Sequence, residues 1–547
     1  MKENFRVVLI NPSNGTIPAD LYAPTEHLGL AYLAAVLRCN GFPVKIIDAY
    51  ALNLSYEEVL KETLDFRPSF IGLTAEYNTI EQAMKLATEF KEKLPEVYIT
   101  FGGEHTTFST IEIFNECIAV DLVIRGEGEI TIVEVMNRLV ENKDLTNVDG
   151  VYFRGNQGEI VTNKERAAIA DLDTLPFPVR DTLDACIERG ITPAISILAS
   201  RGCHANCSFC NASKFFNLGG GSHWRSRDPK KVVDELEFLL ERYKDYPIYE
   251  VVYFNDENFV GPDPDGIRRV HEIAREIKKR NLKLSFEIFC RADSFDGYEE
   301  VVKDLSEAGL ISALVGLESG YQKQLNSFGK GTTVDQNLNT IEIFKNHNII
   351  TSSSGFLMFN PYSNFKEIEE NAKFLLSIGM STLYNMSLKV LGYPGIGMNN
   401  KLKRDELLEE DFGHRNVSGY RFIDKRIGIL AEKLNFNEAI KRKEDAAHRY
   451  LDFMMANLDK KLARIHMMET QNEQVFFLKK IVINQRFNAN LVTYNFFLRS
   501  VILAETGWNQ KAFEEYKESY ISEISAALQV MNDSFVAYIS FLEEVIA

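Results

Sequence analysis

The first 165 residues alternate short, β-rich apolar runs with amphipathic helical stretches. This is the pattern of a doubly wound parallel sheet, in which ligands bind beyond the carboxyl ends of the strands. Strands are predicted at residues 6–11, 43–48, 70–75, 97–102 and 121–125, with helices at 28–39, 56–66 and 80–94. The strand ends carry these candidate ligand-binding residues: Asn11, Thr74, Gly102, Gly103, His105, Gly126, Glu127 and Glu129.

Residues 166–190 are predicted to be a linker, because Pro176 and Pro178 cannot continue a helix. The βα alternation resumes over residues 191–400, with strands predicted at 195–199, 250–255, 283–290, 312–317, 351–359 and 383–391. Six such units suit a partial (βα)6 barrel, whose active site would lie at the C-terminal mouth of the strands.

Strand patterns fade after residue 400, and long amphipathic segments dominate, for example at 422–434, 439–462 and 510–545. Residues 401–547 are therefore predicted to form an all-helical domain. The chain as a whole belongs to the α/β class, with a Rossmann-like sheet, a central barrel and a helical end.

The formal charge of the 547-residue chain is −17, which argues against nucleic acid as a partner, since that needs clustered Lys and Arg. The longest apolar runs, such as residues 7–10 and 311–317, are far shorter than the roughly 20 residues that span a bilayer. Without a secretory signal pattern, the sequence predicts a cytoplasmic protein with no membrane span.

Three of the seven cysteines, Cys203, Cys207 and Cys210, fall within eight residues and suggest a metal centre in a reducing compartment. The other four stand singly and are predicted to be small buried hydrophobes: Cys39, Cys117, Cys186 and Cys290.

The segment 200–212, SRGCHANCSFCNA, places a Cys-x3-Cys-x2-Cys motif directly after a predicted strand. Three thiolates suit an iron–sulfur cluster and leave one of four irons open for a substrate or cofactor. Structural zinc is the alternative. It needs four ligands, and neither His204 nor His223 stands at the paired spacing of zinc motifs.

This motif, with Phe209 before the third Cys, resembles the signature of the radical S-adenosylmethionine (SAM) superfamily. The resemblance implies a 4Fe-4S cluster on the three cysteines and reductive cleavage of SAM to a 5′-deoxyadenosyl radical. Four later strand ends, FNDENF, FCRAD, GLESG and LGYPG, occur in the family's order. They extend the candidate SAM-binding set to Phe209, Asp256, Glu257, Arg291, Glu318, Ser319 and Tyr393. Any one of these, taken alone, fits a polar group bonded to its own loop equally well.

The N-terminal segments PTEHLGLAYLAAVLRCNGFPVKIID, FGGEHTTF and RGEGE, with the linker segment LDTLPFP, resemble the cobalamin-binding domain and linker of B12-dependent radical SAM proteins. The resemblance covers roughly residues 5–395, and it implies that the N-terminal strand ends bind cobalamin. The Asp-x-His-x-x-Gly motif that supplies an axial His elsewhere is absent, so no axial ligand is assigned. The alternative is a degenerate Rossmann-like domain that binds no cofactor.

The resemblance implies a B12-dependent radical SAM enzyme that acts on a small molecule and takes electrons from an external donor such as flavodoxin or ferredoxin. Three reactions stay open: methylation of an unactivated carbon, cyclisation or rearrangement, and a dehydration or reduction with vestigial cobalamin. An iron–sulfur electron carrier would need a fourth Cys ligand nearby. A corrinoid carrier would give the three clustered cysteines no role. The helical domain is expected to cover the barrel mouth, because a radical must be shielded from solvent.

Overall fold

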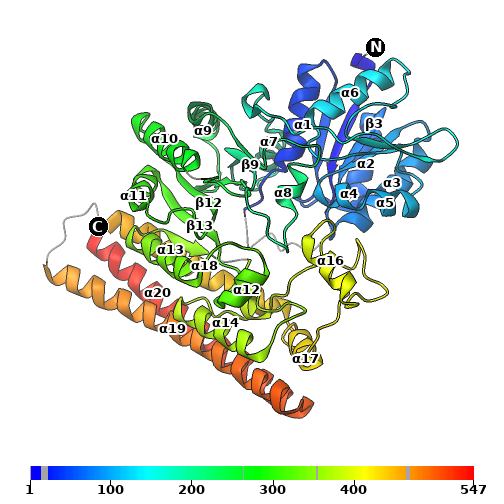
Figure 1. Ribbon diagram of the computed structural model, residues 1–547. Helices are drawn as coiled ribbons and strands as arrows, with labels where there is room; N and C mark the ends of the chain where they lie inside the picture. Colours follow the sequence, from blue (N-terminus) through cyan, green and yellow to red (C-terminus); the bar gives the residue numbers. More distant parts are fainter. Residues whose placement is uncertain (1, 14–22, 263, 353–354, 463–468, 547) are drawn as a thin grey trace. The chain divides into compact units, whose positions relative to one another are not determined.

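The computed structural model describes residues 2–13, 23–262, 264–352, 355–462 and 469–546 (Figure 1). The chain folds into two compact units. The first unit contains Met1–Phe289, Gly392–Lys401 and Asp411–Gly419, and the second contains Cys290–Leu391, Leu402–Glu410 and Tyr420–Ala547. The chain therefore returns twice to the first unit after leaving it.

The first unit begins with a seven-stranded sheet in the order β2-β1-β3-β4-β5-β6-β7. Its first five strands are parallel, as predicted, and span Val7–Asn11 (β1), Val44–Asp48 (β2), Phe70–Thr74 (β3), Tyr98–Gly102 (β4) and Leu122–Ile124 (β5). Its helices are α1 (Leu28–Cys39), α2 (Tyr56–Phe66), α3 (Ile80–Lys93), α4 (Glu104–Phe108), α5 (Thr110–Glu116) and α6 (Glu129–Val140).

An antiparallel hairpin of β6 (Val151–Arg154) and β7 (Ile160–Thr162) extends the sheet beyond β5. The periodicity did not predict this hairpin, because its strands are short and their side chains are mostly half-buried. A Gly-x-x-Gly turn at Gly155 and Gly158, the latter with φ 83°, was the available signal.

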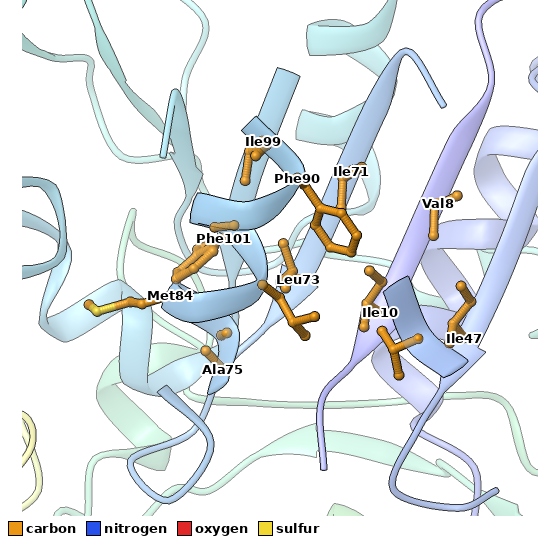
Figure 2. Packing of buried hydrophobic residues seen from close by; sticks show 14 of the residues in the cluster. Val8, Ile10, Ile47, Ile71, Leu73, Ala75, Met84, Phe90, Ile99 and Phe101 are labelled. Carbon is orange, nitrogen blue, oxygen red and sulfur yellow. The ribbon is translucent and has the colours of Figure 1, made fainter. Parts of the chain in front are cut away.

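A hydrophobic core covers each face of the sheet. Successive side chains of each strand point to opposite faces, so they enter the two cores alternately. Val8 and Ile10 of β1 pack on one face with Met84 and Phe90 of α3 (Figure 2). Val7 and Leu9 belong to the core on the other face, with side chains from α1 and α6. The strand ends, with their loops, are left free to bind ligands.

The first unit continues with part of the barrel. β8 (Ser196–Ile197), β11 (Val251–Phe254) and the start of β12 (Ser285–Arg291) are parallel, while β9 (Ser200–Gly202) and β10 (Trp224–Ser226) form an antiparallel pair. The helices here are α7 (Asp181–Glu188), α8 (Ala212–Phe215), α9 (Pro229–Tyr243) and α10 (Asp265–Lys279). α7 lies in the stretch predicted to be a linker.

The second unit contains the parallel strands β13 (Leu310–Gly316) and β14 (Ile350–Ser352) and the helical end of the chain. Its helices include α11 (Glu299–Ala308), α12 (Gln322–Ser327), α13 (Val334–Asn346), α14 (Phe365–Ser377), α15 (Leu383–Ser387), α17 (Lys425–Lys433), α18 (Glu438–Leu462), α19 (Glu469–Thr506) and α20 (Gln510–Ile546). α16 (Gly397–Arg404) crosses from the first unit to the second. The predicted α/β class with a helical C-terminal region is confirmed.

The sixth predicted strand, at 383–391, is wrong. Residues 383–387 form α15 because the Thr382 side chain caps the helix by accepting from the Asn385 backbone N–H. Only an isolated parallel bridge between Phe359 and Lys389 remains of strand pairing there. The predicted strand at 351–359 shortens to β14, although residues 353–354 lie outside the described part. Among the described helices, none is long and apolar enough to cross a bilayer.

Candidate functional site

The three clustered cysteines lie on the loop between β9 and α8. Gly202, directly before Cys203, has φ 84°, and a Cβ there would collide with the His223 backbone. Cys207 is buried and its carbonyl accepts from the Cys210 backbone N–H at 3.2 Å, which closes a turn between the second and third thiols. The loop is thus bent so that the motif leaves β9 as one compact segment.

The donor set fits an iron–sulfur cluster by its chemistry, although no three metal-binding side chains among the described residues are gathered into a ready-made cation site. Burial raises the pKa of Cys210 to about 12, so cluster binding has to displace a proton from this thiol. The remaining cysteines offer no competing set: Cys117, Cys186 and Cys290 are buried singly and Cys39 is exposed. Cys203, Cys207 and Cys210 are the residues that would hold the cluster.

A cavity of about 420 Å³ lies within the first unit, at the ends of the parallel strands. Its lining combines the N-terminal sheet with the barrel: Leu198, Arg201 and Glu257 contribute, as do Phe215 and Phe216 of the helix that follows the Cys loop. Of the predicted residues, it brings together Thr74, Gly102, Gly103, Gly126, Glu127, Glu129 and Glu257. Asn11, His105 and Asp256 do not line it.

Two glycine turns form part of the cavity lining. Gly103 has φ 112°, and a Cβ on it would lie 3.2 Å from the Thr74 hydroxyl oxygen. Gly126 has φ 69° at the end of β5. Both backbones need glycine, because an L side chain is strained at these φ values, and the two turns line the cavity. These residues fit a cobalamin.

The two glutamates at the end of β5 are neutralised by arginines of the barrel. Arg201 pairs with Glu127 at 2.9 Å and with Glu129 at 2.6 Å, and Arg225 pairs with Glu127 at 2.8 Å. All four side chains are at most 7% exposed, and the arginine charges lower the pKa of Glu127 although burial opposes this. Their carboxylates join β9 to the N-terminal sheet, a role that the sequence did not reveal.

His27 lines the cavity and was missed by the sequence analysis; its place immediately before the apolar run of α1 was the available signal. Its Nδ1 accepts from the Leu30 backbone N–H at 3.2 Å, and its Nε2 lies 3.4 Å from the Thr74 hydroxyl oxygen. Burial lowers the pKa of His27, which keeps the ring neutral. A neutral ring that accepts at Nδ1 carries its proton on Nε2, so His27 presents a donor to the cavity and no lone pair for cobalt.

Asn11 and His105, predicted near the corrin, have other partners. The Asn11 amide donates to Asp48 at 2.8 Å. His105 is 4% exposed and packs against His414, with ring centroids 5.7 Å apart. The structure therefore places both side chains away from the cavity lining.

The predicted acidic pair after β11 divides into two positions. Asp256 is fully buried and accepts from the Ala199 backbone and the Ser200 hydroxyl, which fixes the chain between β8 and β9. Glu257 lines the cavity and accepts from the Gly202 N–H at 3.0 Å, beside Cys203. Burial raises the pKa of Glu257 to about 7, because the charged form of the carboxyl is poorly solvated there.

In the second unit, three other predicted SAM residues share local networks. Arg291 donates to Asp293 through two bonds of 2.9 Å and to the Lys330 carbonyl at 2.7 Å. Glu318, with φ 58°, pairs with Lys330 at 2.8 Å. Lys330 thus connects the strand ends of β12 and β13, and sequence spacing alone did not indicate it. The Ser319 hydroxyl donates to Asn371 at 2.8 Å.

Tyr393 and Phe209 belong to the first unit. Tyr393 packs edge-on against Tyr77, with ring centroids 5.2 Å apart. It begins a turn that is bound to the Cys loop: the Met398 N–H donates to the Ser208 carbonyl at 2.7 Å, and Lys214 donates to the Gly395 carbonyl at 2.7 Å. Phe209, half-buried, lies on the Cys loop itself.

Comparison with known proteins matches this layout. Residues 16–136 match the B12 binding domain family and residues 197–375 match the radical SAM superfamily. The chain belongs to the radical SAM enzymes that carry an N-terminal B12-binding domain. The two domains imply a 4Fe-4S cluster, SAM and cobalamin as its cofactors.

Individual relatives support the same class. The Uncharacterized methyltransferase PH0819 of Pyrococcus horikoshii is 29% identical over 71% of this chain and 81% of its own length. The Anaerobic magnesium-protoporphyrin IX monomethyl ester cyclase of Rubrivivax gelatinosus is 28% identical over 67% of this chain, which spans 65% of the cyclase. The cobalamin-dependent S-adenosylmethionine radical enzyme OxsB, solved with aqua-cobalamin and SAM, shares the fold with a TM-score of 0.70 at 20% identity, covering 98% of this chain and 84% of its own.

Proposed function

We propose that this enzyme methylates an unactivated carbon of a small molecule. One observation carries the proposal: the glycine turns of the B12-binding domain and the helix after the Cys loop line the same cavity. A methyl group carried by cobalamin would then lie beside the place where the substrate radical is made. A relative described as a methyltransferase agrees with this choice.

The chain's own residues hold and orient the reactants. Cys203, Cys207 and Cys210 would hold the cluster through their thiolates, and Glu257 would accept a hydrogen bond from the SAM amine at the edge of the cavity. The family resemblance supports SAM roles for Phe209, Arg291, Glu318, Ser319 and Tyr393, whereas the buried Asp256 would act through the chain that it fixes between β8 and β9. When bound, the cluster and cobalamin supply one-electron cleavage of SAM and methyl transfer, respectively. A flavodoxin or ferredoxin supplies the electrons.

The test measures two products that the enzyme can form from SAM. Methylation through cobalamin converts one SAM to S-adenosylhomocysteine and a second to 5′-deoxyadenosine. Reduced enzyme with hydroxocobalamin should therefore form both, and omission of cobalamin should abolish only S-adenosylhomocysteine. The variant with Cys203, Cys207 and Cys210 all replaced by Ala should lose its iron and form no 5′-deoxyadenosine. Formation of 5′-deoxyadenosine alone, with cobalamin bound, would overturn the methylation proposal.

Cyclisation is the second candidate, because the chain is 28% identical to a magnesium-protoporphyrin ester cyclase over 378 residues. A cyclase needs no methyl donor. With cobalamin present, this alternative predicts 5′-deoxyadenosine without S-adenosylhomocysteine.

A further inference from the structure

The segment Asp411–Gly419 returns to the first unit, while the residues on both sides of it belong to the second. It carries His414, which is 6% exposed and therefore as buried as a core residue. Its ring packs against that of His105 on α4, with centroids 5.7 Å apart and the ring planes tilted by 40°. A residue far along the chain thus contacts the helix that follows the glycine turn of the cavity.

Glu116 of α5 holds His414 in place. His414 Nε2 lies 2.8 Å from one carboxylate oxygen of Glu116, and Arg415 donates to the other at 2.6 Å. Arg415 also reaches the Met84 sulfur at 3.1 Å. Burial alone would raise the pKa of Glu116, but bonding to His414 and Arg415 outweighs it and lowers the pKa, so the carboxylate stays charged.

The two histidines do not hold each other through a hydrogen bond. Within the described chain, His105 Nε2 and His414 Nδ1 are buried without a hydrogen-bond partner. Contact between the rings is therefore steric, and its direction is set by Glu116.

α4 connects the contact between His105 and His414 to the cavity. His105 and Thr107 stand two residues apart and so lie on opposite sides of the helix. The Thr107 hydroxyl donates to the Gly103 carbonyl at 2.8 Å and accepts from the Gly126 N–H at 3.1 Å. Gly103 and Gly126 are the two glycines whose turns line the cavity. The His414 ring supports α4 from the far side of these bonds.

We propose that His414 is a positioning residue for cobalamin: held by Glu116, it supports α4 through His105 and so fixes the glycine turns that the corrin contacts. The two partners described for it, Glu116 and His105, are not part of the cavity lining. This inference rests on the B12-binding domain and does not depend on which reaction the enzyme catalyses.

The experiment measures hydroxocobalamin affinity in the full-length protein by equilibrium ultrafiltration, with no turnover required. His414→Ala should raise the dissociation constant at least tenfold, while iron content after cluster reconstitution stays at the wild-type level. His414→Gln, which keeps a donor for Glu116, should recover part of the affinity. Glu116→Gln should give a smaller rise in the same direction and serves if His414→Ala folds poorly.

Two controls separate positioning from general loss of stability. His347→Ala removes a similar His–Glu pair, 3.3 Å from Glu299, in the second unit and should leave the affinity within twofold. Ile113→Val thins the fully buried core at α5, and it should lower the melting temperature without the affinity change. A His414→Ala dissociation constant within twofold of wild type would overturn the inference. A wild-type protein that binds no hydroxocobalamin would overturn the cofactor assignment as well.

Discussion

Arg201 stands two residues before Cys203 and pairs with both Glu127 and Glu129, so one side chain serves the cluster loop and the B12-binding domain. Breaking a buried pair from one side leaves uncompensated charge, which costs roughly 3–5 kcal/mol. We expect Arg201→Met to lower the free energy of unfolding by about that amount in urea titrations. Glu127 keeps Arg225 as a partner in this variant, so we expect a loss at the lower end of the roughly 3–5 kcal/mol range.

Arg268→Met is the matched control, because Arg268 pairs with Asp265 at 2.7 Å on the surface, with side chains 69% and 75% exposed. Such pairs contribute about 0–1 kcal/mol. Equal losses in the two variants would show that the buried network adds no special stability.

Glu444 makes a pH-dependent contribution in the second unit. It is fully buried and accepts from the Leu383 N–H at 2.8 Å, the Thr493 hydroxyl at 2.5 Å and the Tyr520 hydroxyl at 3.0 Å. Burial raises its pKa from 4.5 to about 7. Between pH 4.5 and 7 the folded state keeps a proton that the unfolded state releases, so this contribution is full below pH 4.5 and is lost as the pH rises through 7.

Glu444→Gln cannot titrate and should remove that slope. The melting temperature of wild type relative to Glu444→Gln should therefore fall between pH 5 and pH 8, whereas Glu473→Gln, at an exposed position of α19, should show no trend. A pH-independent difference between wild type and Glu444→Gln would contradict the raised pKa.

At the residue scale, the sequence reveals those groups whose members lie close together in the chain. The Cys motif could be predicted because its three cysteines lie within eight residues and their spacing is typical of a cluster-binding loop. The partners of Glu127, Glu129 and His105 were not found, because Arg201, Arg225 and His414 lie far away in the chain and no local pattern connects them.

At the scale of elements, the five parallel strands of the N-terminal sheet were predicted to within a residue or two. Continuous apolar runs between amphipathic helices leave little ambiguity. The strand predicted at 383–391 is wrong because Leu383, Met386 and Val390 are buried without forming a strand, and Thr382 caps a helix over Leu383–Ser387. Short apolar runs do not distinguish a strand from a buried helical turn.

The turn at Gly395 contacts both α4 and α8. Gly395 has φ 85°, and a Cβ on it would lie 2.6 Å from the Phe108 ring of α4. Its carbonyl accepts from Lys214 of α8, just after the Cys loop. Backbone strain alone would lower the free energy of unfolding by about 1–3 kcal/mol. Gly395→Ala should lower it by more than this and should reduce the iron that the protein retains after gel filtration.

Gly190→Ala is the control, because Gly190 has φ 72° but no atom within 4 Å of its Cβ position. It should show the strain without the loss of iron. Phe108→Ala combined with Gly395→Ala should restore iron if the clash is the cause. Equal iron in Gly395→Ala and wild type would show that the turn does not support the Cys loop.

At the scale of the whole molecule, the return of the chain to its first unit could not be read from the sequence. Periodicity describes neighbours along the chain, while the Gly392 N–H donates to the Val417 carbonyl at 2.6 Å and the Met398 N–H to the Ser208 carbonyl at 2.7 Å. These bonds lie within the first unit, to which Gly392–Lys401 and Asp411–Gly419 belong, whereas Leu402–Glu410 between them belongs to the second.

Hydrogen exchange should reveal this alternation. A ligand that binds only the folded first unit slows the opening of that unit by mass action. On addition of hydroxocobalamin, we expect peptides within Gly392–Lys401 and Asp411–Gly419 to gain protection, while residues 405–410 between them change little. Mass spectrometry of the full-length protein with and without the ligand measures this directly. Each peptide is compared with itself, with and without ligand, so that intrinsic exchange rates cancel. Protection that rises equally across 392–419 would contradict the division of the chain into these two units.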